Sequence, residues 1–375
     1  MKSSTLLIVA AVLLAGCSAT SAASGPDAPA SASATGPLVY VCNQDDATVS
    51  LIDSGTNEVV ETVDLKQLGF GPNAKPHHVV VEPDGSYWYV SLIGENRVVK
   101  LDRSNRVVGV AEFDVPGMLA LHPTDDVLLV GRSMTAVNPP ERIGVITRST
   151  MQVEELPVLF PRPHAIALNA AADVGYTASL AVNQLAAVNY GDEHVNLVPV
   201  PGQPAALMQF ALSPDERTLV ITGEVSGELF VFDVSDPMRP QLVDRIDAGV
   251  QPFDPIFTKD GRWVYFGNKL ADRVSVVDMN RRSVAKTIEH EGIRQPHGVA
   301  ISPDGRYVYV SNNNLGAEAH RMMSADHAAH AGARAQGEPG LGTVVVIDTA
   351  TQQVVDVITV GRNASGIAIA QGQSR

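Results

Sequence analysis

The sequence predicts an all-β fold: a seven-bladed β-propeller of four-stranded antiparallel blades, with the ring closed by pairing of the N-terminal and C-terminal strands. Three observations carry this prediction. Apolar runs joined by tight turns recur along the chain, the recurring unit is roughly 41 to 48 residues long, and the two ends of the repeat region are incomplete in complementary ways. A period of that length with β patterning is typical of propellers, whose blades bury their faces against their neighbours.

Hairpins are the clearest repeated element. PHHVVVEPDGSYWYVSL begins at Pro76 and PHGVAISPDGRYVYVSN begins at Pro296. Asp-Gly between alternating apolar runs is a strong hairpin signal, because Gly supplies the positive φ that a tight turn requires. After each hairpin comes a third apolar run, such as RVVKLD, and then a more polar fourth run, such as TNEVVETVDL. Weaker copies of the hairpin begin at Leu119, His164, Phe210 and Pro255.

The ends of the repeat region decide the blade count. The run LVYVCN from Leu38 reads as a second strand with no first strand before it, and SGIAIA from Ser365 reads as a first strand with no second strand after it. Pairing the two closes the ring at seven blades and protects both edges. An open β-solenoid is the alternative, and it would leave both edges bare.

The N-terminus has the pattern of a secretory signal. Lys2 precedes an apolar run from Leu6 to Leu14, which is too short for a permanent membrane helix. Leu14-Ala15-Gly16-Cys17 resembles the lipobox of bacterial lipoproteins, and that resemblance implies lipidation of Cys17 and cleavage of residues 1–16. An ordinary signal peptide with an incidental cysteine is the alternative.

Residues 17–37 read as a flexible tether, because they are almost entirely Ser, Ala, Thr, Gly and Pro and cannot bury enough apolar surface to become ordered. Ser18, directly after the lipidated cysteine, resembles the residue of lipoproteins sorted to an outer membrane. We therefore expect a lipid-anchored protein of the cell envelope that faces the periplasm, with the outer membrane favoured. The propeller itself is expected to span residues 38–375.

Composition limits the partners and the means of stabilisation. The formal net charge is −14 and the pI is about 5.1, which argues against nucleic acid and anionic lipid as main partners, since both need clustered Lys and Arg. Cys42 is the sole cysteine after Cys17, so the propeller can form no internal disulfide. We expect a monomeric ring that is stabilised by burial, with Cys42 a buried small apolar residue.

Several segments resemble a known repeat family. YVCNQDDATVSLIDSGTNEVVETVDL, YVYVSNNN and GTVVVIDTATQQVVDVITVG are similar to the YVTN repeat of extracytoplasmic propellers, a group that includes YncE-like proteins and the propeller of nitrous oxide reductase. The resemblance covers essentially Leu38 to Ala370. It is specific for fold and uninformative about function, because this architecture hosts enzymes, cofactor domains and binding scaffolds. No second domain with its own copper site follows, so the likeness to nitrous oxide reductase is partial.

Candidate chemistry lies where the inner strands begin. In a propeller the first strand of each blade is innermost, so the residues that open it line the central channel at one end, which we call the mouth. Three of the seven aligned residues are histidines that could ligate a metal or fill the channel, whereas the Met and Phe among them are expected to be packing residues. The seven aligned positions are His77, Gly117, His164, Met208, Phe253, His297 and Ser365.

A long loop in the sixth blade is expected at the same mouth. Residues 313–342, between its second and third strands, contain His and Met side chains, and long unstructured loops in compact repeats are usually functional or disordered. Imidazole and thioether are ligands that copper favours. The candidate loop ligands are His320, Met322, Met323, His327 and His330.

These observations predict a binding protein. At the mouth it would hold a transition metal, with copper favoured over zinc, or a metal-bearing partner. Two other classes stay open. PHHVVVEPDGSYWYVSLIGENRV also looks like the lactonase branch of seven-bladed propellers, although acidic and basic catalytic residues could not be assigned around the mouth. The third class is a scaffold for an envelope protein or polymer. His122, His194 and His290 are expected at the surface.

Overall fold

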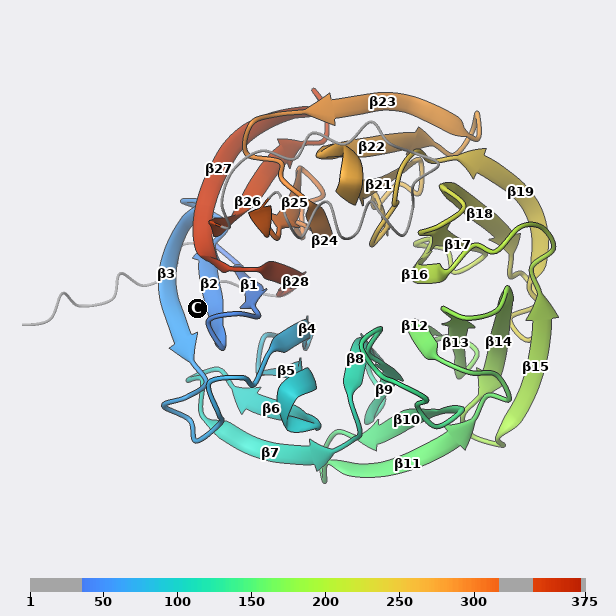
Figure 1. The fold of residues 1–375 in the computed structure, drawn as a ribbon, viewed down its shortest axis with the longest axis horizontal. Coiled ribbons are helices and arrows are strands. Elements are labelled where there is room, and N and C mark those ends of the chain that lie inside the picture. The colour runs from blue at the N-terminus through green and yellow to red at the C-terminus, as the bar shows by residue number, and fades with distance from the viewer. Residues whose placement is uncertain (1–35, 317–339, 372–375) are drawn as a thin grey trace, which may run out of the picture. The chain divides into compact units, whose positions relative to one another are not determined.

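The computed structural model describes residues 36–316 and 340–371, all within the unit formed by residues 33–375. These residues form seven four-stranded antiparallel sheets around a central axis (Figure 1). The predicted all-β, seven-bladed propeller is confirmed. Cys17 and the loop candidates His320, Met322, Met323, His327 and His330 lie outside the described residues.

Blades are numbered from the first one whose four strands are consecutive in the chain. The strands of each blade are given in order from the innermost to the outermost. Blade 1 contains β4 (Pro76–Val81), β5 (Tyr87–Leu92), β6 (Arg97–Asp102) and β7 (Val107–Glu112). Blade 2 contains β8 (Pro116–Leu121), β9 (Val127–Arg132), β10 (Arg142–Thr147) and β11 (Gln152–Pro157). Blade 3 contains β12 (Pro163–Asn169), β13 (Val174–Ser179), β14 (Gln184–Asn189) and β15 (His194–Pro199).

The next three blades repeat this order. Blade 4 contains β16 (Leu207–Leu212), β17 (Thr218–Gly223), β18 (Glu228–Asp233) and β19 (Gln241–Asp247). Blade 5 contains β20 (Ile256–Phe257), β21 (Trp263–Asn268), β22 (Arg273–Asp278) and β23 (Ser283–Glu289). Blade 6 contains β24 (Pro296–Ile301), β25 (Tyr307–Asn312), β26 (Leu341–Asp348) and β27 (Gln353–Arg362).

The seventh blade joins the two ends of the chain. Its innermost strand is β28 (Ala364–Ile369), which pairs with β1 (Leu38–Asn43), followed outward by β2 (Thr48–Asp53) and β3 (Glu58–Asp64). Val39 lies opposite Ile369 and Val41 lies opposite Ile367 in this antiparallel pair. The predicted closure is confirmed.

Blade 5 departs from the predicted pattern. The sequence places a strand from Pro255 onward, but β20 is reduced to two residues, and an isolated bridge between Pro252 and Asn268 is all that precedes it. Pro255 has no backbone N–H to give to the ladder, so the pairing breaks at Asp254-Pro255. The break matters for the site, because it frees Asp254 from a regular strand.

Apolar packing holds the blades together. Within the described residues, each of the seven interfaces between neighbouring blades has its own hydrophobic cluster. Tyr40 of blade 7 contacts Trp88 of blade 1 with ring centroids 5.3 Å apart, and Tyr176 of blade 3 contacts Phe210 of blade 4 at 6.4 Å. Cys42 is fully buried, as predicted. Ring stability therefore rests on interfaces that each need both neighbours.

The same backbone arrangement, which we call the joint, recurs before every inner strand and positions the residues of the mouth. The residue before each inner strand has positive φ, between 45° and 55°, and its carbonyl accepts a hydrogen bond of 2.8–3.2 Å from the N–H of the first residue after that blade's second strand. A β-bulge or break in pairing follows directly in every inner strand. The seven residues of positive φ are Lys75, Val115, Arg162, Ala206, Gln251, Gln295 and Asn363.

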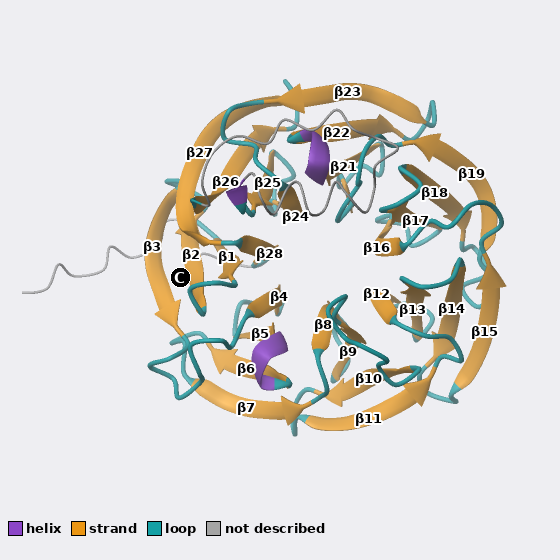
Figure 2. Ribbon diagram, viewed as in Figure 1, coloured by secondary structure: helices purple, strands orange, loops and turns teal. Residues whose placement is uncertain are grey.

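Two single-turn 3₁₀ helices, η1 (Ile93–Glu95) and η2 (Lys269–Ala271), lie in the described part of the chain and connect the second and third strands of blades 1 and 5 (Figure 2). None of the helices in the described part of the chain has the length and apolar character needed to span a bilayer.

Candidate functional site

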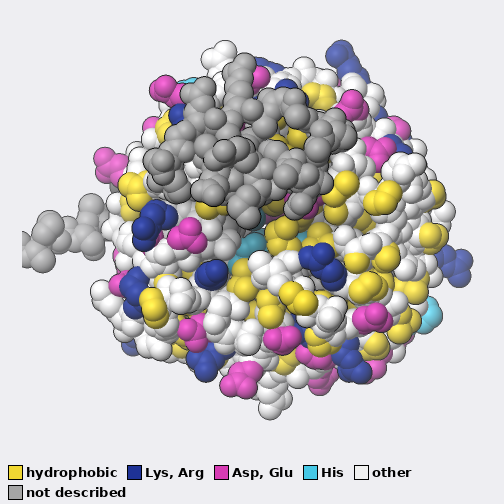
Figure 3. Space-filling model, in the orientation of Figure 1, with side chains coloured by type: hydrophobic (Ala, Val, Ile, Leu, Met, Phe, Trp, Pro, Cys, Tyr) yellow, Lys and Arg dark blue, Asp and Glu magenta, His cyan; other side chains and the backbone are white. Residues whose placement is uncertain are grey.

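The seven aligned positions open the inner strands as the sequence predicts. Each lies one residue after the first paired residue of its strand, and all seven are buried. The joint described above explains this common placement, since it turns the chain at the same point in every blade. Figure 3 shows histidine side chains at the centre of the face that it presents.

Three imidazoles from different sides of the ring meet here. The His77 ring from blade 1 lies 5.8 Å from the His297 ring of blade 6 and 6.4 Å from the His164 ring of blade 3, measured between centroids. Phe253 of blade 5 packs on His297 at 5.0 Å. We call His77, His164 and His297 the histidine cluster. The structure thus brings together histidines that are far apart in the chain: 87 positions separate His77 from His164, and 133 separate His164 from His297.

Hydrogen bonding fixes the tautomer of His164. Its Nδ1 lies 2.8 Å from the carbonyl oxygen of Arg132, which can only accept, so Nδ1 carries the proton and Nε2 keeps a lone pair. Arg132 is itself buried, and its guanidinium contacts Glu155 at 2.7 Å. This support holds the His164 ring in an orientation that leaves Nε2 available as a ligand.

The other two rings have nitrogens with no hydrogen-bond partner among the described residues. Gln44 Nε2, which can only donate, lies 3.1 Å from His77 Nδ1, so Nδ1 accepts and the proton of the neutral ring is on the buried, unpartnered Nε2. His297 Nδ1 is also buried without a partner in the described part of the chain. Leaving a buried polar atom unpaired costs free energy on the order of 1–3 kcal/mol, so two such atoms in adjacent rings make the mouth a candidate binding site.

Burial keeps these imidazoles neutral. Desolvation lowers the pKa of His164 to about 4 and holds the pKa of His77 and His297 well below the usual value. The neighbouring charges of Lys269 and of the other histidines lower the pKa of His77 and His297 further. Neutral imidazole is the form that ligates metals, so the cluster is competent for ligation at neutral pH.

His78 is a fourth imidazole at the mouth that sequence reasoning missed. It follows His77 in the bulge of β4, and its Nδ1 accepts a hydrogen bond from the Leu119 N–H at 3.2 Å. Burial lowers its pKa to about 4. The signal was present in the Pro-His-His sequence, but only the bulge shows that two successive residues can both face inward.

Acidic and basic groups, which sequence reasoning could not assign, are also present. Asp254 follows Phe253 at the break in blade 5, and Lys269 and Glu224 are the first residues after the second strands of blades 5 and 4. Burial raises the pKa of Asp254 to about 7 and lowers the pKa of Lys269 to about 8, the latter against the attraction of Glu224 and Asp254. Their positions relative to the joint could have been read from the aligned repeats.

The spacing of the cluster limits what it can hold unaided. Two imidazoles on one tetrahedral ion have ring centroids about 5 Å apart, given metal–nitrogen distances of about 2.0–2.1 Å. The observed separations of 5.8 and 6.4 Å are longer, so each pair of rings would have to close by about 1 Å. A further ligand or a larger metal-bearing group would relieve that requirement.

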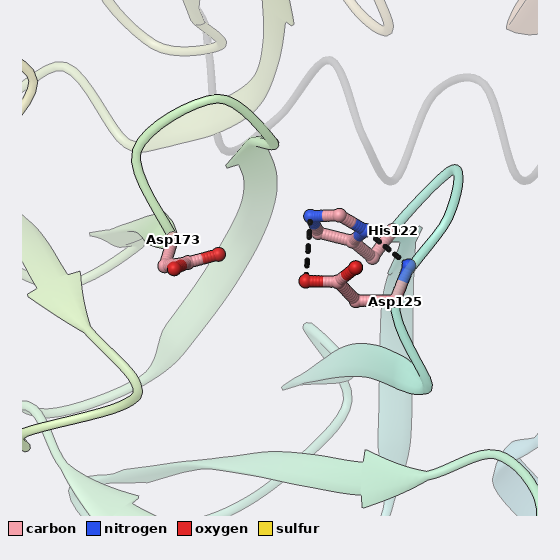
Figure 4. Close-up of side chains that lie close together, drawn as sticks. All are labelled: His122, Asp125 and Asp173. Carbon is pink, nitrogen blue, oxygen red and sulfur yellow. Dashed lines mark hydrogen bonds and ion pairs between the residues drawn. The ribbon is translucent and has the colours of Figure 1, made fainter.

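A second group with metal-like composition lies elsewhere, where blades 2 and 3 adjoin. Among the residues that the structure describes, His122, Asp125 and Asp173 are the single set of three candidate ligands within 4.8 Å of one another (Figure 4). However, His122 Nδ1 accepts the Asp125 N–H at 2.7 Å, so the neutral ring carries its proton on Nε2, which lies 3.3 Å from the Ala170 carbonyl. That nitrogen is a donor, and the arrangement braces a turn.

The same contacts correct one sequence expectation. His194 and His290 are exposed as expected, but His122 is buried, because residues of blade 3 pack over it. The position of His122 beside a turn predicted exposure, because the sequence does not show that the neighbouring blade covers this turn.

Comparison with known proteins supports the fold and leaves the family open. No family model and no curated protein sequence matches the chain. Among solved structures, the chain is similar to a functionally unknown protein from Desulfotomaculum acetoxidans DSM 771, with 13% identity, 90% of this chain and 100% of that chain covered, and a TM-score of 0.69. It is also similar to streptogramin B lyase, with 14% identity, coverage of 73% and 86%, and a TM-score of 0.60.

A third similar structure is the dihydro-heme d1 dehydrogenase NirN in complex with DHE, with 16% identity, coverage of 89% and 75%, and a TM-score of 0.57. At these identities the likeness concerns the fold alone. Resemblance to the YVTN repeat therefore stays a resemblance of sequence.

Proposed function

We propose that this chain is an envelope binding protein that holds a transition metal, copper above zinc, or a metal-bearing partner, at the mouth of its propeller. The observation that carries the proposal is the pair of buried nitrogens with no hydrogen-bond partner among the described residues, His77 Nε2 and His297 Nδ1, in rings 5.8 Å apart. For His77 to ligate through Nε2, its proton would have to move to Nδ1, with the Gln44 amide turned so that its oxygen accepts it.

The third histidine strengthens the case for a ligand site. His164 Nε2 has its lone pair fixed by the Arg132 carbonyl, and its ring lies 6.4 Å from His77. Because the three rings stand slightly too far apart for one ion, we expect His77 and His297 to bind first. His164, or the proposed loop ligands His320, Met322, Met323, His327 and His330, would complete the coordination.

Localisation belongs to the same proposal. We expect cleavage before Cys17 and lipid attachment to it, which would hold the propeller at the outer membrane facing the periplasm. Replacing Cys17 with Ser should release the protein from membranes, because no other strong anchor is apparent in the sequence. Fractionation of cells that express each form measures this directly. Retention of the serine variant in the membrane fraction would refute the anchor.

Metal titration tests the site. The full chain should bind Cu²⁺ by calorimetry, and a His77→Ala, His164→Ala, His297→Ala variant should lose that binding. A His194→Ala, His290→Ala variant removes two exposed histidines and serves as the matched control. Deletion of residues 317–339 separates the loop from the cluster. Equal binding by wild type, triple variant and loop deletion would exclude both and favour a scaffold.

The acidic and basic groups at the mouth favour an enzyme as the second candidate, which would agree with the partial resemblance to lactonases. Asp254, with a pKa of about 7, could exchange a proton near neutral pH and so act as a general acid or base. A panel of lactones assayed with wild type and Asp254→Asn tests this. Hydrolysis by wild type that the asparagine variant loses would establish the enzyme, whereas no hydrolysis by either would exclude it.

A further inference from the structure

Lys269 is an unusual neighbour for a metal site. Its side chain is buried beside the histidine cluster, with Nζ 4.5 Å from the centroid of Phe253, whose ring packs on His297 at 5.0 Å. A cation–π contact holds the ammonium in this position. The ring of Phe253 therefore separates the positive charge of Lys269 from the imidazole of His297.

Nothing within the described part of the chain pairs closely with this charge. Lys269 takes part in none of the ion pairs formed there within 4.0 Å. Asp254 and Glu224 attract it from farther away, and Glu224 Oε1 accepts a hydrogen bond from Gln251 Nε2 at 3.0 Å. Burying an ammonium without a counter-charge within 4.0 Å is costly, so a bound anion that pairs closely with Lys269 would stabilise it.

We propose that Lys269 forms an anion subsite beside the histidine cluster, and that the molecule bound at the mouth carries a carboxylate group that pairs with it. The identity of this molecule as metal-bearing rests on the proposed function, but the anion subsite itself does not. A bare cation at the cluster would be repelled by Lys269, whereas an ion with a bound carboxylate would satisfy imidazoles and ammonium together.

Charge at the subsite should follow pH in a defined direction. The titratable groups that interact electrostatically with Lys269 are Glu224, Asp254, His77 and His297, from four different blades. The histidines are neutral near pH 7, because burial lowers their pKa. As the pH rises, Asp254 gains its negative charge near pH 7 and Lys269 loses its positive charge near pH 8, so carboxylate binding should be strong at pH 6 and weak at pH 9.

The test uses oxalate as the carboxylate probe and the full chain without added metal. Calorimetry should show saturable binding to wild type at pH 6.5. We expect Lys269→Met to weaken that binding about tenfold or more, the loss typical of a charge-assisted hydrogen bond, and Lys269→Arg to retain most of it. Lys259→Met removes an exposed lysine of the same blade and is the matched control.

A separate Cu²⁺ titration without oxalate distinguishes this proposal from the proposed function. Lys269→Met should bind Cu²⁺ as well as wild type or better, because a repelling charge is gone, whereas a merely misfolded variant would lose both ligands. Failure of wild type to bind Cu²⁺ would refute the proposed function and leave the subsite standing if oxalate still binds. No oxalate binding, or equal binding by wild type and Lys269→Met, would overturn the subsite.

Discussion

Acid should unfold this propeller through the histidines at its mouth. Burial lowers the pKa of His78 and His164 to about 4, from about 6.5 in the unfolded chain. Below pH 6.5 these histidines are therefore protonated in the unfolded chain but stay neutral in the folded chain. The free energy of unfolding must fall as the pH falls, and the penalty must grow until the folded-state pKa is reached.

The size of the effect follows from the shift. For a single group with pKa values of about 6.5 and about 4, the unfolded state gains about 2 kcal/mol at pH 5. His77 and His297, whose pKa values are lowered well below 6.5 by burial, contribute in the same direction. His78 and His164 together therefore give about 4 kcal/mol at pH 5, a large fraction of the stability of a typical domain. We expect unfolding near pH 5 and full stability above about pH 7.

Urea unfolding at pH 7.5, 6.5, 6.0 and 5.5 measures this, since the slope of the unfolding free energy against pH counts protons. Each histidine adds up to about 1.36 kcal/mol per pH unit, a limit that is approached as the pH falls below about 6. His164→Asn can still donate to the Arg132 carbonyl but cannot titrate, so its slope should be smaller by about that amount. His194→Asn, at an exposed histidine, is the matched control. An unchanged slope in His164→Asn would refute the reasoning.

Three further predictions follow from single features. Truncation after Asp348 removes β27 and β28, bares two strand edges and takes five of the twelve buried residues from the cluster between blades 6 and 7. It should destabilise the ring by more than about 5 kcal/mol in thermal unfolding, and an unchanged melting temperature would contradict closure. Val115 is β-branched at a φ of 45°, so Val115→Asn should stabilise by about 0.5–1 kcal/mol in urea, and a loss would show that no strain is stored there. Gln44→Glu should raise Cu²⁺ affinity about tenfold by orienting His77, and Gln44→Leu should lower it; equal Kd values would exclude that role.

The periodicity of the sequence was sufficient for the architecture. Alternating apolar runs and Asp-Gly turns fix local pairing, and the incomplete ends at Leu38 and Ser365 require each other. Alignment of the turns also gave the seven mouth positions correctly. Pro255 shows the limit of this reasoning, because an apolar run alone does not reveal that its missing N–H leaves β20 with two paired residues.

By itself, then, the sequence determined which residues open each inner strand, and with them the histidine cluster as a set. What only the tertiary structure decided is how these residues meet. The bulges turn His78 inward beside His77, closure of the ring buries Lys269 over Phe253 near His297, and blade 3 covers His122. These contacts join blades far apart in the chain, and their distances depend on how seven interfaces pack around one axis. Local periodicity carries no information about that geometry.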